Sequence, residues 1–356
     1  MPEITQERVL KALEDVKDPD LGQSIVQMGM VKDLRIDGTQ LTFTCELTTP
    51  ACPLKEQIEK DIRAKIAERI PEVTDLRLTM TGRVRGAGAM GAASPPAEDI
   101  AMPQVRNVIL VGGGKGGTGK STCAVNLALA LKSRGAKVAL LDADIYCPAL
   151  HILLGLHERP QTAEGNKIKP LIAFGMEVMS LGFLVEPDQP MMWRGPVVGG
   201  IMMQFLHDVL WSENDYLIID LPPGVGEVPL ALTQNCAPAG ALLVSTPQYA
   251  SIAAVVRAGH LFEQMHIPVL GLMENMSGGI FGKATVEKAA AEMQLPFLGT
   301  IPLSEAISQG SDAGLPIVHS SPDSEPAHAF VAVAENLAAQ VSIRSFQPQM
   351  NTDKHG

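Results

Sequence analysis

Apolar residues follow two different patterns along the chain, one in residues 1–85 and another after residue 103. In the first part, two segments have the apolar spacing of amphipathic helices, and three alternate like half-exposed strands. The helical segments are Thr5–Val16 and Pro53–Ile70, and the strand segments are Val31–Ile36, Gln40–Leu47 and Asp75–Thr81. This mixture predicts a small α+β domain.

After residue 103, short and almost continuously apolar runs alternate with stretches of helical spacing. Strands that are buried on both faces have this character, because helices cover both sides of a parallel sheet. We therefore predict an α/β domain built on a parallel sheet. Its expected strands are Val105–Val111, Lys137–Leu141, Tyr216–Ile219, Ala241–Val244, Val269–Met273 and Pro296–Ile301.

A segment rich in glycine, alanine and proline separates these two parts. Residues 86–103 read GAGAMGAASPPAEDIAMP and lack any periodicity, which is typical of a linker. The predicted organisation is therefore a small α+β domain at residues 1–85, the linker at 86–103, an α/β domain at 104–345 and a polar tail at 346–356.

Composition and charge exclude several classes of protein. Apolar residues make up 46% of the chain and charged residues 19%, which is ordinary for a globular protein and excludes general disorder. The formal net charge of −11 disfavours binding to nucleic acid or to an anionic membrane. Five scattered cysteines do not suggest a disulfide framework, so we expect a reducing, cytoplasmic location.

One uncharged stretch, Val228–Val256, is long enough to suggest a membrane span. Prolines interrupt it at positions 229, 238 and 247, together with Asn and Gln residues. A helix, a turn, a buried strand and a second turn fit this order better than a span. We therefore expect no membrane partner.

A phosphate-binding loop is the strongest chemical motif in the chain. Residues 114–122 match the pattern G-x-x-x-x-G-K-[ST], directly after the run VRNVILVGG and before the helical segment Cys123–Ser133. Glycines let backbone N–H groups converge on phosphates, and the N-terminus of the next helix adds positive charge. Lys120 is expected to reach the β- and γ-phosphates of ATP, and Ser121 to ligate Mg²⁺. The predicted nucleotide-binding residues are Gly114, Lys115, Gly116, Gly117, Thr118, Gly119, Lys120, Ser121 and Thr122.

Acidic residues stand at the ends of two of the predicted strands. Asp142 and Asp144 close the run KVALLDAD, and Asp220 closes the run DYLIID. The carboxyl ends of parallel strands meet at the ligand-binding edge of such a sheet. We interpret Asp220 as the acid that holds Mg²⁺ through a bound water, and Asp144 as the residue that positions the attacking water.

The loop carries a second lysine, Lys115, as do the deviant Walker A ATPases that include the MinD, ParA and Mrp/ApbC proteins. Further segments resemble the Mrp/ApbC iron–sulfur carrier family in particular. They are LDADIYCPA (141–149), MWRGPVV (192–198), DYLIIDLPPGVGEVPLAL (215–232), STPQ (245–248), ENMS (274–277) and IPLSEAISQGSDAGLPIV (301–318). The front domain resembles the iron–sulfur-assembly accessory domain often fused to these carriers, through DPDLGQSIVQMGMV (18–31) and TTPACPLKEQI (48–58).

This resemblance implies a doubly wound, mostly parallel P-loop NTPase domain that works as a homodimer with ATP at the interface. Lys115 would reach the phosphates of the other subunit, and Asn275 matches the family's adenine-contacting position. Lys115, Lys120 and Asp144 would be the catalytic residues. ATP binding and hydrolysis would close and reopen the dimer as a conformational switch. Apo iron–sulfur client or scaffold proteins would be the partners.

The chain departs from the family's usual cluster site. Those carriers place C-x-x-C between ENMS and IFG, whereas ENMSGGIFG (274–282) contains no cysteine. Iron–sulfur clusters normally need four thiolates. Cys52 matches the cysteine of the front domain's T-x-x-x-C-P pattern and is the candidate cluster ligand. Cys147 falls near the expected nucleotide, and Cys123 is expected in the core.

Three functions from different classes are compatible with these motifs. The leading hypothesis is an ATPase that assembles or transfers iron–sulfur clusters, using Cys52 and the front domain. The second is a nucleotide switch or scaffold that, like MinD and ParA proteins, handles a protein partner without a cluster. The third is a metabolic kinase or a dethiobiotin-synthetase-like ligase, since the fold hosts many activities.

Overall fold

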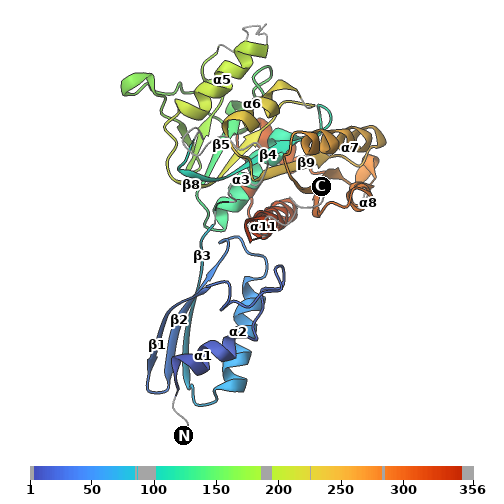
Figure 1. Ribbon diagram of the computed structural model, residues 1–356. Coiled ribbons are helices and arrows are strands. Elements are labelled where there is room, and N and C mark those ends of the chain that lie inside the picture. The colour runs from blue at the N-terminus through green and yellow to red at the C-terminus, as the bar shows by residue number, and fades with distance from the viewer. Residues whose placement is uncertain are drawn as a thin grey trace, which may run out of the picture. The chain divides into compact units, whose positions relative to one another are not determined.

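The computed structural model describes residues 4–84, 86, 102–185, 195–224, 226–282 and 285–346 (Figure 1). Contacts between Cα atoms divide the chain into two compact units. The small unit is Met1–Arg85 together with Ser342–Gly356, and the large unit is Gly86–Val341. Most of the predicted linker, the tail after residue 346 and the start of the MWRGPVV segment lie outside the described residues. The predicted domain boundaries therefore stay predictions.

The small unit contains the predicted mixture of helices and strands. Its elements are α1 (Gln6–Leu13), β1 (Val31–Asp37), β2 (Gln40–Leu47), α2 (Lys55–Arg69) and β3 (Asp75–Gly82). The sheet has the order β1-β2-β3, with β1 antiparallel and β3 parallel to β2. A tight turn at Gly38, whose φ of 58° favours glycine, joins the antiparallel pair. The helix α2 makes the longer crossover that parallel strands need.

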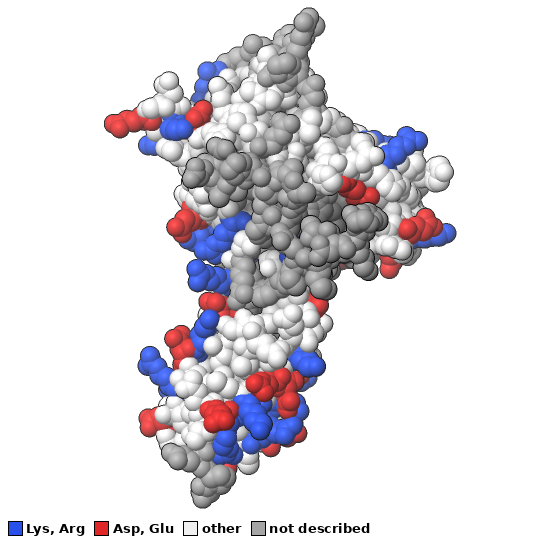
Figure 2. Space-filling view, viewed as in Figure 1, with Lys and Arg blue, Asp and Glu red and all other residues white. Residues whose placement is uncertain are grey.

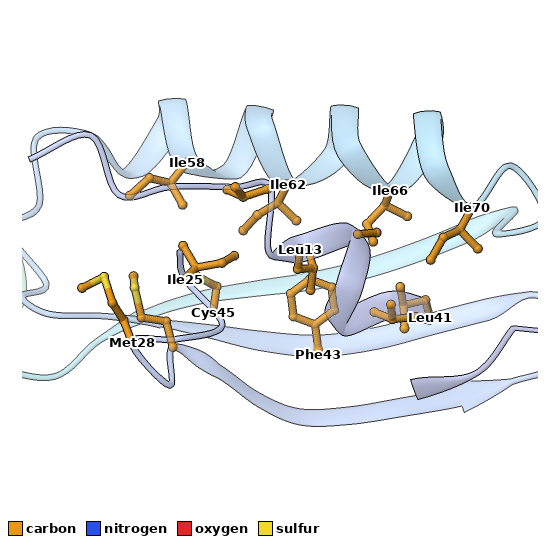
Figure 3. Packing of buried hydrophobic residues seen from close by; sticks show 14 of the residues in the cluster. Leu13, Ile25, Met28, Leu41, Phe43, Cys45, Ile58, Ile62, Ile66 and Ile70 are labelled. Carbon is orange, nitrogen blue, oxygen red and sulfur yellow. The ribbon is translucent and has the colours of Figure 1, made fainter. Parts of the chain in front are cut away.

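The core of the small unit lies between α2 and the sheet (Figure 3). Isoleucines recur every four residues along α2 and therefore share one buried face. Alternate residues of β2 face them, because successive side chains of a strand point to opposite sides. The side chains concerned are Ile58, Ile62, Ile66, Leu41, Phe43 and Cys45. Burying one large apolar side chain of this kind stabilises a fold by about 1.5–3 kcal/mol.

The surface of the small unit is charged but mixed. Figure 2 shows acidic and basic side chains interspersed on the visible face of this unit. Arg63 pairs with Glu59 one turn away on α2, and Arg69 pairs with Asp15, each with an N–O distance of 2.8 Å. Exposed pairs contribute at most about 1 kcal/mol each. We therefore regard this face as solvated surface rather than as a charged binding patch.

The large unit is built on an eight-stranded sheet (Figure 1). Its strands are β4 (Val105–Gly112), β5 (Val138–Asp142), β6 (Leu171–Ala173), β7 (Met176–Met179), β8 (Asn214–Asp220), β9 (Gly240–Ser245), β10 (Val269–Ser277) and β11 (Phe297–Pro302). The order is β11-β10-β9-β4-β8-β5-β7-β6, and all pairs are parallel except β6 with β7. The predicted fold class is confirmed, and all six predicted strands are present. The sequence does not predict β6 and β7, which are only three and four residues long.

Helices connect the strands of this sheet, and three more, α9 to α11, follow its last strand. They are α3 (Lys120–Ser133), α4 (Leu150–Leu153), α5 (Gly195–His207), α6 (Glu227–Asn235), α7 (Tyr249–Gln264), α8 (Thr285–Glu292), α9 (Glu305–Asp312), α10 (Ile317–Ser320) and α11 (Glu325–Phe346). From β4 the chain passes through α3 to β5 on one side, whereas β9 lies on the other side of β4. The strand order thus reverses at β4, and open α/β sheets bind ligands beside such a reversal.

None of the described helices is long and apolar enough to cross a membrane. The uncharged stretch at 228–256 forms part of α6, all of β9 and the first half of α7, in the helix, turn and strand order that its prolines predict. Every residue of β9 is buried. A strand that is covered on both faces explains the apolar character of this stretch.

Candidate nucleotide site

The predicted phosphate loop joins β4 to α3, at the point where the strand order reverses. Gly117 and Gly119 both have a φ of 78°, a left-handed conformation that favours glycine. Gly114 has no room for a side chain, because a Cβ atom there would overlap the backbone of Ala254 in α7. The loop therefore needs these glycines for its backbone geometry and its close packing, as a phosphate cradle does.

The residues of the loop differ in how far they are enclosed. Lys120, the first residue of α3, is buried, with 7% of its surface exposed. Lys115 is half-buried and keeps part of its surface in solvent. The remaining residues are exposed at Gly116 and Gly117, buried at Thr118, and half-buried at Gly114, Gly119, Ser121 and Thr122. The two lysines of the loop thus have different surroundings.

Asp220 ends β8 directly beside the end of β4, where it pairs with Val111 in the sheet. Its carboxylate is completely buried, and neither oxygen has a hydrogen-bond partner among the described residues. Burial raises the pKa of Asp220, the charge of Asp142 raises it further, and nearby Ser121 and Lys120 oppose the rise. A buried carboxylate is costly unless a cation or a bound water pairs with it. Asp220 and Ser121 therefore fit a magnesium–nucleotide complex.

Asp144 lies two residues beyond the end of β5, on the same edge of the sheet. Its Oδ1 accepts a hydrogen bond from the backbone N–H of Cys147 (3.1 Å). Burial raises the pKa of Asp144, while this hydrogen bond and the positive charge of Lys120 oppose the rise. The positive charge of Lys120 lowers the pKa of both Asp144 and Asp220, and the charge of Asp144 raises the pKa of Asp220. The structure thus brings together three residues that the sequence assigned to nucleotide chemistry.

Asp142 lies at the end of β5, where the sequence predicted an acidic residue but assigned it no role. Its Oδ1 accepts a hydrogen bond from the backbone N–H of Asp144 (3.1 Å). Its Oδ2 accepts from the N–H groups of Ala149 (3.0 Å) and Leu150 (3.1 Å) and from the hydroxyl of Ser180 (2.9 Å). Burial raises the pKa of Asp142, and these hydrogen bonds oppose the rise. The D-x-D spacing could have pointed to Asp142, but Ser180 lies 38 residues away in the sequence.

Glu274 and Asn275 lie near the end of β10, on the opposite side of β4 from Asp142. Asn275 Nδ2 donates a hydrogen bond to the carbonyl oxygen of Thr118 (2.9 Å), so Asn275 lies against the phosphate loop. Glu274 is fully buried, and its Oε2 accepts hydrogen bonds from the backbone N–H groups of Thr285 and Val286 (3.1 Å each). Glu274 is not among the predicted site residues, because its backbone partners lie 11 and 12 residues further along the chain.

The five cysteines all lie in the described part of the chain, form no disulfide, and are distributed over both units. Cys123 is buried, as predicted, and so are Cys236 and Cys45; burial is the largest cause that raises the pKa of Cys45 to about 12. Cys52 is half-buried and Cys147 is exposed. Within the described part of the chain, no three His, Cys, Asp or Glu side chains form a group that could hold a metal ion.

Models of known protein families match both units of the chain. The family described as NUBPL iron-transfer P-loop NTPase matches residues 104–338. The family described as iron–sulfur cluster assembly protein matches residues 6–77. The assembly-protein family thus matches the front domain, and the P-loop NTPase family matches the domain that contains the phosphate loop.

Curated relatives match the chain over nearly its whole length. The iron–sulfur cluster carrier protein of Synechocystis sp. is 41% identical over 96% of this chain and 99% of the relative. The iron–sulfur cluster carrier protein of Deinococcus radiodurans is also 41% identical, over 95% of this chain and 96% of the relative. The solved structure of a nucleotide-binding protein from Archaeoglobus fulgidus, in complex with ADP, is 34% identical with a TM-score of 0.54, over 61% of this chain and 90% of that one. This chain belongs to the family of iron–sulfur cluster carrier proteins, which are P-loop NTPases.

Proposed function

We propose that the chain is a cytoplasmic, homodimeric ATPase that couples hydrolysis of ATP to the assembly or transfer of iron–sulfur clusters to apo client proteins. The observation that carries the ATPase part is Asp220, a buried carboxylate without a partner among the described residues, beside Ser121. The Mg²⁺ ion of a magnesium–nucleotide complex in the phosphate loop would provide positive charge next to this carboxylate. Membership of the family of iron–sulfur cluster carrier proteins supports an iron–sulfur cluster as the species that is transferred.

The side chains around the loop would divide the chemistry among them. Lys120 would bind oxygens of the β- and γ-phosphates, Ser121 would ligate Mg²⁺, and Asp220 would hold a water on the metal. Mg²⁺ bound with the nucleotide supplies neutralisation of charge on the phosphates. Asp144 would accept a hydrogen bond from the attacking water and orient it toward the γ-phosphate. Asn275, which already contacts the loop, would recognise the adenine base.

The homodimer would complete the site through Lys115. This lysine belongs to the loop itself but is only half-buried, so its ammonium group can extend beyond its own subunit. We propose that it binds the phosphates of the partner subunit, as a cation supplied in trans does in other phosphoryl-transfer sites. The dimer would then close when ATP is bound and reopen after hydrolysis, which is the conformational switch.

A second candidate function is a nucleotide switch that handles a protein partner without holding a cluster. The observation that favours it is the cysteine-free segment ENMSGGIFG, together with the missing ligand group in the described residues. Under the first proposal, Cys52 of each subunit would provide thiolates and the client or scaffold the others. Under the second, Cys52 has no role with iron.

Turnover of ATP tests the ATPase part of the proposal. Purified protein should hydrolyse ATP only with Mg²⁺, and Asp144→Ala should retain nucleotide binding but lose hydrolysis by about 100-fold or more. Lys115→Ala should also lose hydrolysis, and a mixture with Asp144→Ala should recover part of it if Lys115 acts in trans. Normal hydrolysis by Asp144→Ala would contradict the role of this residue.

Anaerobic reconstitution with iron and sulfide distinguishes the two candidate functions. Both elements are counted per chain for the wild type and for Cys52→Ala, with Cys236→Ala as the control because Cys236 is buried. A cluster that is present in the wild type and lost only in Cys52→Ala supports the carrier function. Absence of a cluster from every variant supports the switch.

A further inference from the structure

The loop that carries Asp144 is held at both ends by one buried side chain. Residues 143–149 join β5 to α4, a helix of four residues that is too short to be stable by itself. Asp142 accepts hydrogen bonds from the backbone N–H of Asp144 near the start of the loop and from those of Ala149 and Leu150 at its end. The carboxylate of Asp142 therefore fixes the two ends of the loop relative to each other.

Ser180 connects this carboxylate to another part of the large unit. Its hydroxyl donates to Asp142 Oδ2 (2.9 Å) and accepts from the backbone N–H of Gly182 (3.0 Å), directly after β7. Gly182 has no room for a Cβ atom, which would overlap the ring of His151 in α4. Asp142 and Ser180 are 1% and 0% exposed, so water does not compete for their hydrogen bonds.

We infer that Asp142 and Ser180 are positioning residues for ATP hydrolysis, and that they act through Asp144. The inference rests on the role of Asp144 in the proposed function. Asp142 fixes the backbone nitrogen of Asp144, and Ser180 holds the Asp142 carboxylate in the orientation that does so. Neither side chain needs to contact the nucleotide. A charged acceptor forms shorter and stronger hydrogen bonds than a neutral one, which suits this task.

The hydrogen bonds of Asp142 and Ser180 support the loop that carries Asp144, so we expect their loss to change the rate of ATP turnover rather than the affinity for nucleotide. The phosphate loop belongs to a different segment, 114–122, whose geometry depends on its own glycines and on the contact with α7. A displacement of about 1 Å in a group that orients a reactant can lower a rate about 100-fold. Relaxation of the Asp144 loop should therefore slow hydrolysis and leave nucleotide affinity unchanged. A merely structural role would instead reduce stability without changing turnover per bound nucleotide.

The test compares the full-length wild type with Ser180→Ala, Asp144→Ala and the control Ser251→Ala. Ser251 is an equally buried serine of the same unit, and its hydroxyl bonds to Ser245 and to the backbone of Thr246 instead. The measurements are kcat per nucleotide-binding site, KM, and the Kd of a non-hydrolysable ATP analogue. We expect Ser180→Ala to lower kcat about tenfold while Kd stays within about twofold, and Ser251→Ala to keep kcat. A wild-type kcat in Ser180→Ala would overturn the inference.

A double-mutant cycle with Asp142→Asn tests whether Ser180 acts through Asp142. Once Asp142 is replaced, Ser180→Ala should lower kcat by less than about twofold further, because its partner has already been altered. Independent losses that multiply would overturn the inference. If Asp142→Asn does not fold, the comparison of Ser180→Ala with Ser251→Ala decides alone.

The same set of proteins separates failure of this inference from failure of the proposed function. A wild type that binds but does not hydrolyse ATP would refute the proposed ATPase. An inactive Asp144→Ala beside a fully active Ser180→Ala would leave the proposed function intact and refute the positioning role.

Discussion

Two buried carboxylates, one in each unit, have different surroundings. In the small unit, Asp18 is buried, and its Oδ1 accepts hydrogen bonds from the backbone N–H groups of Asp20 (2.9 Å) and Leu21 (3.1 Å). In the large unit, Asp220 is completely buried and has no hydrogen-bond partner among the described residues. A carboxylate with partners stabilises the turn that it closes, whereas one without partners destabilises the fold that contains it.

The buried residues as a whole also differ between the two units. The buried cluster of the small unit is apolar, and its candidate thiol, Cys52, lies at the edge of that cluster. The large unit buries Lys120, Asp142, Asp220 and Glu274 at one edge of its sheet. Asp142 and Glu274 have hydrogen-bond partners, whereas Asp220 has none among the described residues. A cluster of buried ionisable groups of this kind is typical of a functional site. We therefore expect substitutions in the large unit to affect nucleotide chemistry, and substitutions in the small unit to affect stability.

The largest effect is expected for Lys120→Ala. Loss of the ammonium group should weaken ATP binding by about 100-fold or more, because a charged hydrogen bond to phosphate is removed from a buried site. Calorimetric titration with ATP and Mg²⁺ measures this. Lys132→Ala, in the last turn of the same helix, is the matched control and should bind like the wild type. Equal binding by both variants would contradict the nucleotide site.

Asp220→Asn should have opposite effects on the empty and the nucleotide-bound protein. Without nucleotide, replacement of this buried carboxyl by a neutral amide should raise the free energy of unfolding by about 1–3 kcal/mol, because burial disfavours the ionised form of Asp220. With Mg²⁺, ATP affinity should fall about tenfold, and chelation of Mg²⁺ should abolish the difference from the wild type. Denaturant unfolding and ATP titration measure the two effects.

Asp18→Ala is the matched variant for Asp220→Asn in the small unit. It removes a carboxylate that has partners, so it should lower the free energy of unfolding by about 1 kcal/mol and leave ATP affinity unchanged. If both variants change stability in the same direction, the proposed difference between the two carboxylates is wrong.

Ile62→Val should cost the small unit about 0.5–1.5 kcal/mol of stability, because it removes one methylene from a packed core. ATP turnover per chain should not change. Thermal unfolding and the ATPase rate are measured on the same preparation. A parallel loss of turnover would mean that the small unit contributes to hydrolysis.

Thiol modification of the native protein should distinguish the exposed from the buried cysteines of the two units. Cys147 is exposed and Cys52 half-buried, so both should react with iodoacetamide, with Cys147 the faster. Cys45 should react only after unfolding, because burial keeps its thiol protonated by raising its pKa to about 12. Mass spectrometry of peptides identifies the modified residues. Rapid native modification of Cys45 would show that the small core opens.

Features encoded by neighbouring residues could be predicted from the sequence. The phosphate loop and the strands β4, β5, β8, β9, β10 and β11 combine a local motif with uninterrupted apolar runs. The strands β6 and β7 could not be predicted, because three or four residues are too few to show a period. The identity of the candidate site was thus predictable from segments that are short and continuous.

The supporting contacts of the site could not be predicted, because they join residues that lie far apart in the sequence. Ser180 meets Asp142 across 38 residues, and Asn275 meets the carbonyl of Thr118 across 157. A family motif marks Asn275 as a candidate, but it does not indicate that this side chain lies against the phosphate loop. Only the packing of strands beside one another brings such pairs together.

The order of strands in the two sheets also has a consequence for biosynthesis. The small sheet pairs segments that follow one another closely, since Val31 pairs with Cys45 and Gln40 with Asp75. The central strand β4 must wait for β8, because Val105 pairs with Asn214. Pairing between distant segments is slow, and an unpaired apolar strand is prone to aggregation. We therefore expect the small sheet, β1 to β3, to form first on the ribosome, while the nascent β4 stays without this partner until β8 has emerged.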